Sequence, residues 1–587
     1  MQRSRTAWWR LLAIIAALGL LAAACGDDDG GDGGDDPTTE STDETDDGGG
    51  DDDTDDAAPQ YGGSIVVGLE AESNTFTPGP AQLANGGTTV AMAIFDPLMA
   101  QNSEGELEGF LAETLEPNED LTQWTLKLRE GIQFHDGTPL DADTLLWNFE
   151  TLHFSETSQT RGSLVSAGVT GMEVVDELTV RYNLSEPNAG FPDLLRLEAG
   201  WPISRAAYEL DPENSDDNLA GTGPFKLESW TRDGEFVAVR NENYWRSDAG
   251  GNQLPYLDQI TFRPITDEDA RVNSLASGDV DMMQTLRGSA VKQVQALVEE
   301  GGFDANMHIG NNSGSALLNV LEPPLDDLRI RQALAYAGDA DQVQIVLGDD
   351  GLTEPSTGFF SQDSPWYSET AAEAYPGYGG RDVEAASALV EEYKNDPERS
   401  DDKAVGETVD VEYSCPPDPS LIEVSQLQQQ LFEEVGFTVS LRQVEQAAHI
   451  QNAIGTADQE PPFKGNYSIN CWRAGGGEGD PLTALQSFFG PVATTAGNFA
   501  NFTSPEIDEQ LEILRNNADF ATRYAAVEQI SIISAQQVPI LWSSPTPTIV
   551  GYRDVIRGVT DWKLPDGAMG TGTPQSVARF YEVWIDE

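Results

Sequence analysis

The sequence predicts an α/β protein that contains parallel strand pairing. A strand, a helix and a strand follow one another between residues 409 and 441, and this order makes a βαβ unit with parallel strands. Alternating apolar residues between Trp124 and Arg129 predict another strand with one buried face. The chain has 587 residues, which is long enough for more than one domain.

The N-terminus has the three parts of an export signal in the required order. A basic start is followed by an apolar run at residues 11–21 and by small residues at 22–24. The apolar run is shorter than the roughly 20 residues that a membrane span needs. Residues 21–26 resemble a lipobox, which implies that Cys25 is diacylated and anchors the chain to a membrane. The alternative is an ordinary signal peptide with an unrelated cysteine. We therefore assign residues 1–25 to a lipoprotein signal peptide.

Residues 26–60 form a low-complexity acidic segment without Lys or Arg. Such a segment self-repels and cannot bury apolar area, so we expect a disordered tether. A calcium site is the alternative, but the spacing of the Asp residues lacks the pattern of an EF-hand loop. The net charge of −68 argues against nucleic-acid binding, because phosphate backbones require Lys and Arg.

The first half of the body continues with a turn and a helix after the strand at Trp124. His135, Asp136 and Gly137 predict a turn, and Asp141 is placed to cap a following helix. We expect His135 to have a structural role in this turn rather than to bind a metal ion. Residues 178–184 alternate again and predict a further strand.

The second half contains the βαβ unit and the two cysteines of the body. Pro419 and Ser420 open its helix, and Ser420 with Glu423 has capping-box spacing. Cys415 follows the first strand, and Cys471 lies near the end of a later strand. If these two strands are parallel neighbours, both sulfurs lie at one edge of the sheet, which permits a disulfide. The alternative is a pair of buried free thiols.

Short motifs follow one another along the body from about Tyr61 to Trp584. They lie at residues 94–98 (IFDPL), 124–143 (WTLKLREGIQFHDGTPLDAD), 221–225 (GTGPF), 243–245 (NYW), 277–281 (SGDVD) and 324–337 (containing RIRQAL). Each motif alone is a weak signal. Together, in this order, they closely resemble family 5 of the bacterial extracellular solute-binding proteins, the large peptide- and nickel-type binders.

The resemblance implies a periplasmic-binding-protein-like α/β fold, in which two lobes joined by hinge strands enclose a ligand in a central cleft. We expect the first lobe at residues 61–318, with an extra subdomain near 96–220. The second lobe is expected at 319–545. Residues 546–587 then return to the first lobe.

The resemblance also suggests where a ligand binds. In peptide-binding members of this family, an aspartate lies three residues after the tryptophan of the corresponding strand. The resemblance implies that this aspartate holds the α-amino group of the peptide. Here Trp472 is followed at that distance by Gly475, so this ammonium clamp is missing. Our candidate ligand-binding residues are Trp472, Arg473, Glu478 and Asp480.

Three of these candidates have a structural alternative. Trp472 is suited to stacking on a ligand or to core packing. Arg473 offers a planar fork for a carboxylate, or a surface charge. Asp480 precedes Pro481 and is also placed to cap the next helix.

The function predicted from these features is capture of a solute outside the cytoplasm for an ABC importer. We expect a dipeptide or oligopeptide as the solute, a permease and an ATPase as partners, attachment to the outer side of the cell membrane, and a monomer without cofactor. A sugar-like solute, a chelated metal or a ligand-sensing role are the alternatives. A secreted hydrolase is disfavoured, because neither a G-x-S-x-G nor an H-E-x-x-H motif occurs.

Overall fold

The computed structural model divides the chain into two units, Met1–Asp56 and Ala57–Glu587. It describes residues 58–232, 234–454, 465–476, 479–490, 498–499 and 501–586. The predicted signal peptide, Cys25 and nearly all of the predicted tether lie outside these residues, as does Glu478. The second unit holds all of the described residues.

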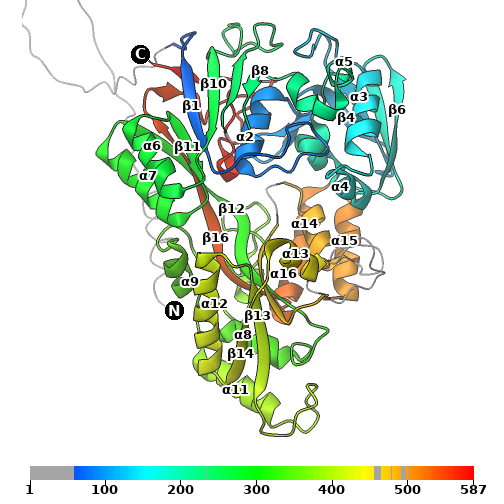
Figure 1. The fold of residues 1–587 in the computed structure, drawn as a ribbon. Coiled ribbons are helices and arrows are strands. Elements are labelled where there is room, and N and C mark those ends of the chain that lie inside the picture. The colour runs from blue at the N-terminus through cyan, green and yellow to red at the C-terminus, as the bar shows by residue number, and fades with distance from the viewer. Residues whose placement is uncertain are drawn as a thin grey trace, which may run out of the picture. The chain divides into compact units, whose positions relative to one another are not determined.

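A ten-stranded mixed sheet runs through this unit (Figure 1). Its strands are, in spatial order, β14 (Phe437–Gln443), β13 (Val409–Cys415), β15 (Ile469–Gly475), β12 (Phe303–Leu318), β16 (Ile540–Arg553), β11 (Met282–Thr285), β1 (Ser64–Leu69), β10 (Gln259–Pro264), β9 (Phe236–Arg240) and β8 (Phe225–Trp230).

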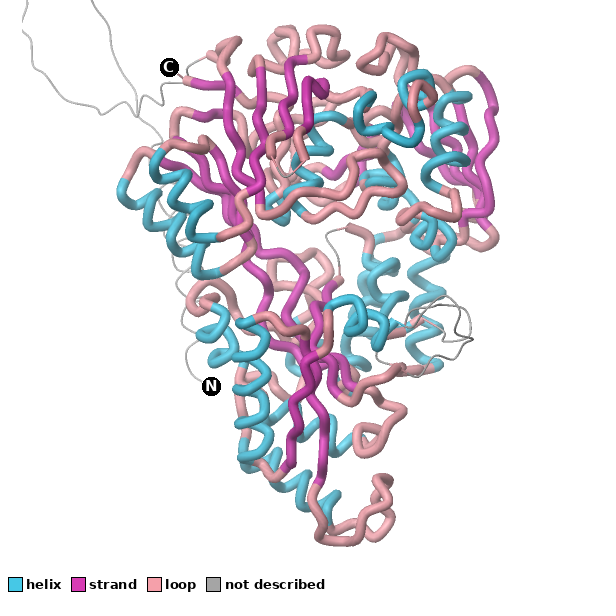
Figure 2. The backbone as a smooth tube through the Cα atoms, viewed as in Figure 1, coloured by secondary structure: helices cyan, strands magenta, loops and turns pink. Residues whose placement is uncertain are grey.

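The two longest strands, β12 and β16, lie in the middle of this order and pair antiparallel with each other. Figure 2 shows them running between the two parts of the unit that carry the other strands. Their pairing has register shifts between Ile309 and Ser315. One half of the sheet adds β15, β13 and β14 to this pair, and the other half adds β11, β1, β10, β9 and β8.

The predicted βαβ unit is present. β13 and β14 pair in parallel and are connected by α12 (Pro419–Glu434). The predicted cap of α12 is wrong, however. Asp418 is the N-cap, because its carboxylate accepts hydrogen bonds from the backbone N–H groups of Ser420 and Leu421.

A separate four-stranded antiparallel sheet contains the predicted Trp124 strand. Its strands are, in spatial order, β4 (Ala112–Pro117), β5 (Gln123–Leu128), β7 (Thr179–Leu184) and β6 (Val169–Asp176). The predicted cap Asp141 is confirmed, since its side chain accepts the N–H of Thr144 at the start of α3 (Ala142–Asn148). Short strand pairs are β2 (Met99–Gln101) with β3 (Leu107–Gly109), and β17 (Ile556–Arg557) with β18 (Trp584–Ile585).

Helices cover the sheets. The remaining α-helices are α2 (Asn85–Ile94), α4 (Arg161–Ser166), α5 (Arg205–Tyr208), α6 (Glu268–Ser277), α7 (Gly288–Glu300), α8 (Leu328–Ala337), α9 (Ala340–Leu347), α10 (Glu369–Glu373), α11 (Val383–Lys394), α13 (Gln446–Ile454), α14 (Pro481–Phe489), α15 (Pro505–Asn516) and α16 (Phe520–Gln537). Shorter turns are the π-helical η1 (Phe149–His153) and the 3-10 turns η2 (Phe191–Arg196), η3 (Glu198–Gly200), η4 (Pro212–Asn218) and η5 (Pro574–Ser576).

The apolar core is divided into clusters. One cluster collects buried residues between Ala316 and Trp542. A second joins residues from Ile65 to Met282 with residues from Val550 to Val583, so the C-terminal segment packs with the first part of the chain. A third lies between Leu98 and Leu195 around the four-stranded sheet. The exact lobe boundaries given above remain predictions.

Candidate functional site

A cavity of about 570 Å³ lies at the carboxyl ends of β11 and β13 and beside β15. Its walls come from the starts of α7 and α12, from α9 and α13, and from β12, β15 and β16. We call it the strand-end cavity. The carboxyl ends of strands are where α/β sheets bind ligands, and the volume is typical of small-molecule sites, which measure roughly 300–1,000 Å³.

Gly288 allows one wall of the strand-end cavity to form. A Cβ atom at this position would lie 2.6 Å from the carbonyl oxygen of Gly348 and 2.2 Å from a carboxylate oxygen of Asp349. Only a residue without a side chain therefore permits the start of α7 to approach the end of α9 so closely. This contact brings Arg287, which precedes α7, to the cavity together with residues of the second half of the chain.

Arg473 lies on β15 and lines the strand-end cavity. Its side chain is solvent-accessible and makes no ion pair or hydrogen bond with the described residues. Burial by the surrounding walls lowers the pKa of its guanidinium, and repulsion by Arg287 lowers it further, while Glu70 and Asp349 act in the opposite direction. A guanidinium in this position is available for a carboxylate of a ligand.

Asp349 is the buried acidic group of the strand-end cavity. Burial raises the pKa of its carboxyl to about 6, although the backbone N–H of Gly288 and the nearby Lys292, Arg287 and Arg473 favour the charged form. The sequence contains no local pattern that identifies Asp349 or Arg287 as site residues. Both are brought to the cavity by the packing of α7 against α9.

Trp472 lines the same cavity and is half-buried. Its ring stacks near that of His449, with 6.1 Å between ring centroids, and lies 5.7 Å from the ring of Phe499. His449 is held by its Nε2 atom, 2.8 Å from the carbonyl oxygen of Cys471. Trp472 therefore combines core packing with a place in the cavity wall, and contact with a ligand remains a prediction.

Gly475 is closely packed against β12. A Cβ atom at Gly475 would lie 2.0 Å from the carbonyl oxygen of Asn311. An aspartate at this position would therefore require the backbone of β12 to shift. The backbone around Gly475 therefore leaves no room for the aspartate side chain that would form an ammonium clamp at this position.

Asp480 lies apart from the strand-end cavity. It caps α14 by accepting the N–H of Leu482, and its carboxylate is 2.6 Å from Nη2 of Arg523. Both side chains are buried, so this is a buried ion pair. Asp480 thus has the capping role that Pro481 indicated, and its role as a ligand-binding residue stays a prediction.

Cys415 and Cys471 are joined by a disulfide in the structure, with 5.3 Å between their Cα atoms. The expectation that their strands are parallel neighbours is confirmed, since Tyr413 pairs with Ile469 and Ser414 with Asn470. Continuing this register places the two cysteines opposite each other at the edge of the strand-end cavity.

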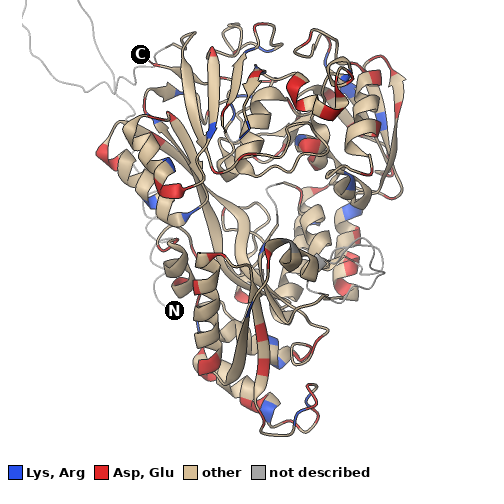
Figure 3. Cartoon of the chain, in the orientation of Figure 1, with Lys and Arg blue, Asp and Glu red and all other residues tan. Residues whose placement is uncertain are grey.

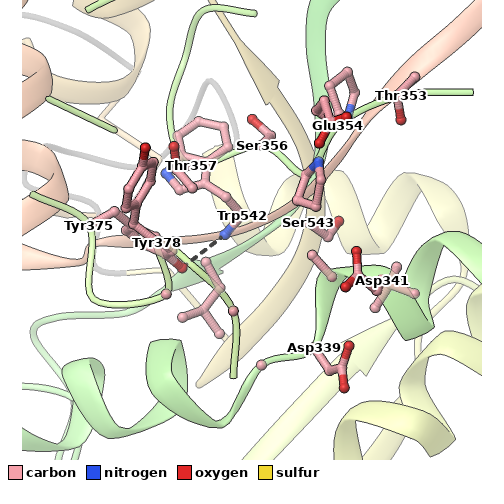
Figure 4. A pocket seen from close by; sticks show the side chains of 18 of the residues that line it. Asp339, Asp341, Thr353, Glu354, Ser356, Thr357, Tyr375, Tyr378, Trp542 and Ser543 are labelled. Atoms are coloured by element: carbon pink, nitrogen blue, oxygen red, sulfur yellow. Dashed lines mark hydrogen bonds between the residues drawn. The ribbon is translucent and has the colours of Figure 1, made fainter. Parts of the chain in front are cut away.

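A larger cavity of about 870 Å³ lies next to the strand-end cavity. The two share the wall residues Val343, Gln428, Leu541, Trp542 and Ser543. Figure 4 shows Tyr375, Tyr378 and Trp542 on one side and Asp339 and Asp341 on another. The hydroxyl of Tyr375 accepts the backbone N–H of Trp542 at 3.3 Å. Sequence patterns did not indicate these residues.

Groups suited to a metal ion are not assembled in the described part of the chain, where no cluster of three or more His, Cys, Asp or Glu occurs. His135 lies in its turn with Nε2 3.0 Å from the carbonyl oxygen of Gly223. Burial lowers the pKa of His135 to about 4. Over the described ranges, no helix is long and apolar enough to cross a membrane.

Residues 106–496 match the family described as bacterial extracellular solute-binding proteins, family 5 Middle. The chain belongs to this family. This family 5 protein is 25% identical over 490 residues to the glutathione-binding protein GsiB of Escherichia coli strain K12, covering 81% of this chain and 88% of that protein. The family and its extracytoplasmic setting agree with the sequence prediction.

Solved structures with the same fold support the two-lobed architecture. The ABC transporter substrate-binding protein CtaP of Listeria monocytogenes has a TM-score of 0.69 and 21% identity, covering 90% of this chain and 100% of that chain. The oligopeptide-binding protein AppA of Bacillus subtilis, in complex with a nonapeptide, has a TM-score of 0.67 and 17% identity over 90% and 100% of the two chains.

A third similar structure is AgaA of A. tumefaciens R10 in complex with agropinic acid. It has a TM-score of 0.70 and 23% identity, over 89% of this chain and 99% of that chain. The predicted two-lobed α/β fold is confirmed, and the family match identifies this family 5 protein as an extracellular solute-binding protein.

Proposed function

We propose that this chain is a lipid-anchored receptor that captures a short peptide with an exposed carboxylate and delivers it to an ABC permease and its ATPase. The observation that carries this proposal is Arg473, a guanidinium without an ion pair in the strand-end cavity. The chain has 100 acidic and 32 basic residues. A cavity arginine that forms no ion pair with the described acidic side chains is therefore suited to an acidic ligand.

The edge of β15 supports a peptide as the solute. β15 pairs with β12 as far as Gly475, but it pairs with β13 only at Ile469 and Asn470. An extended peptide could add to the remaining edge by backbone hydrogen bonds, which provide affinity without requiring one side-chain sequence. The similar proteins named for glutathione and solved with a nonapeptide are consistent with this class of solute.

A non-peptide acidic solute is the second candidate. Gly475 favours it, because no carboxylate holds an α-amino group at this position. The similar protein AgaA was solved with agropinic acid. Mass spectrometry of the ligand that copurifies with the protein distinguishes a peptide from another acid.

Substitution of Arg473 tests the proposal directly. Arg473→Met removes the guanidinium and keeps much of the apolar stem, so affinity for the copurified solute should fall by about ten- to a hundredfold, as for a lost charge-assisted hydrogen bond. Isothermal titration calorimetry measures this change. Arg263→Met is the matched control, because Arg263 is paired with Glu235 at 2.8 Å outside the cavity. Equal affinity in both variants would refute the carboxylate role of Arg473.

Membrane attachment through Cys25 is a separate part of the proposal. Cys25→Ser removes the sulfur that would carry the lipid, so the chain should move from the membrane fraction to the soluble fraction. Continued fractionation of this variant with membranes would contradict the lipid anchor and leave the carboxylate role of Arg473 unaffected.

A further inference from the structure

A third cavity, of about 270 Å³, lies between the β2–β3 region, β12 and the C-terminal segment. We call it the Arg579 cavity. Its lining includes Asn102, Arg196, His308, Thr571 and Arg579. None of its lining residues is Asp or Glu. In a chain with 100 acidic and 32 basic residues, a polar cavity with two arginines and no carboxylate is unexpected.

Arg579 has no partner for its charge among the described residues. It makes no hydrogen bond or ion pair with them, and its Nη1 atom is buried without a hydrogen-bond acceptor. The other two guanidinium nitrogens also have no hydrogen-bond partner among the described residues, and Arg579 lines the cavity. The guanidinium carbon lies 5.9 Å from the ring centre of Trp562.

The surroundings of Arg579 increase the cost of its unpaired charge. Burial lowers the pKa of its guanidinium, and the positive charge of Arg196 lowers it further, while Tyr581 acts in the opposite direction. No acidic side chain contributes to this balance. A buried cation without a counter-ion destabilises the folded state, so binding of an anion here would remove a cost that already exists.

Arg196 and His308 line the cavity beside Arg579. Arg196 is fixed by Asp193, with Nε 2.5 Å from Oδ1, and its Nη2 atom borders Gly479 in the loop after β15. Nδ1 of His308 accepts the backbone N–H of Gln575 at 3.2 Å. The neutral ring of His308 therefore carries its proton on Nε2. The carboxylates Glu106 and Glu108 are near Asn102, whose amide nitrogen donates to them, but neither lines the cavity.

We infer that the Arg579 cavity is a second binding site, specific for an oxyanion group such as a carboxylate or a phosphate, with Arg579 as its anchor. The planar fork of a guanidinium matches the paired oxygens of either group. The oxyanion is either a free inorganic anion or an acidic group on a captured solute. This inference does not depend on the role proposed for Arg473.

Calorimetric titration of the purified full chain with inorganic phosphate, and separately with acetate, at fixed ionic strength tests the site. We expect saturable phosphate binding that Arg579→Met weakens at least tenfold. Arg557→Met is the control, because Arg557 is an exposed arginine of the C-terminal segment paired with Asp586. Binding of acetate as well as phosphate would support a carboxylate ligand, and binding of phosphate alone a phosphate ligand.

The unfolding temperature of Arg579 variants distinguishes an anion-binding role of Arg579 from a structural role. Without added anion, Arg579→Met should unfold at the same temperature as the unsubstituted chain or a higher one, because it removes an uncompensated charge. If Arg579→Met does not fold, Arg579→Lys keeps the charge without the fork and should weaken phosphate binding severalfold. Phosphate affinity within twofold of the original in the folded Arg579 variant would overturn the inference.

Arg473→Met should bind phosphate normally. Loss of phosphate binding in Arg473→Met, with retention in Arg579→Met, would assign the anion to the strand-end cavity. That result would overturn the second site and leave the proposed function standing.

Discussion

At the scale of a single residue, Asp96 has an unusually high pKa for a carboxyl group. Its side chain is fully buried, and it accepts hydrogen bonds from the Tyr244 hydroxyl at 3.0 Å and from Nε1 of Trp245 at 2.9 Å. Burial raises its pKa from 3.8 to about 7, although these hydrogen bonds and Arg246 favour the charged form. The two hydrogen-bond donors and the nearby cation therefore lower the pKa of Asp96 by less than the loss of hydration raises it.

This raised pKa predicts the pH dependence of stability. Between about pH 4 and pH 7 the folded chain holds a proton on Asp96 that the unfolded chain releases, so the free energy of unfolding falls as the pH rises. The fall amounts to on the order of 4 kcal/mol. Asp96→Asn should remove this contribution and be more stable than the original chain at pH 7 and above. Urea unfolding at several pH values measures it.

A matched control separates Asp96 from other acidic groups. Asp519 is an exposed helix cap whose pKa is lowered by its hydrogen bonds with Thr522. Asp519→Asn should therefore leave the fall between pH 4 and pH 7 intact. An identical pH profile for Asp96→Asn and the original chain would contradict the assignment.

At the scale of the elements, the disulfide connects β13 to β15 beside the strand-end cavity. Its two cysteines are separated by 56 residues in the sequence, and closing a loop of this length stabilises the fold by about 4 kcal/mol in the chain-entropy model. The double variant Cys415→Ala/Cys471→Ala should lose stability of that order in urea unfolding. Reduction should have the same effect on the original chain and none on the variant.

Thiol labelling provides an independent measurement of this pair. After denaturation without reductant, neither Cys415 nor Cys471 should react with a thiol reagent, and both should react after reduction. Labelling of both residues without reductant would mean that they are free thiols, the alternative that the sequence left open.

The elements also show how far the sequence determines the fold. β13, α12 and β14 were predictable, because apolar periodicity, Pro419 and Gly436 are local signals. Capping-box spacing predicts Ser420 as the cap of α12, but Asp418 is the cap, because two capping residues lie two positions apart and only geometry distinguishes them. The pairing of β12 with β16 was not predictable from local patterns, since it joins residues more than 200 positions apart and β12 lacks a regular alternation of buried residues.

The same distinction applies to the candidate site. Trp472 and Arg473 are predictable because they lie on a strand that resembles a family motif, and both line the strand-end cavity. Arg287, Asp349 and Arg579 were missed, because each depends on packing between distant parts of the chain. The local sequence around Arg579 does not show that its guanidinium lacks a counter-ion in the folded chain.

At the scale of the whole molecule, the net charge of −68 opposes the local charge of the strand-end cavity. Figure 3 shows that Asp and Glu are spread over both parts of the described chain. An acidic solute is therefore repelled at long range and attracted only at short range, as it is near Arg473. Such repulsion acts over about 30 Å at 0.01 M salt and about 10 Å at 0.1 M.

This opposition predicts an unusual salt dependence of binding kinetics. For an acidic solute, the association rate constant should rise severalfold between about 10 mM and 100 mM salt, because salt screens the long-range repulsion more than the short contact with Arg473. Stopped-flow fluorescence measures this rate, since Trp472 and Trp542 line the cavity. An uncharged analogue of the solute should associate at a rate that salt hardly changes. An association rate that falls with salt would instead mean that positive potential around the cavity extends far enough to steer the solute, and that the acidic surface does not govern encounter.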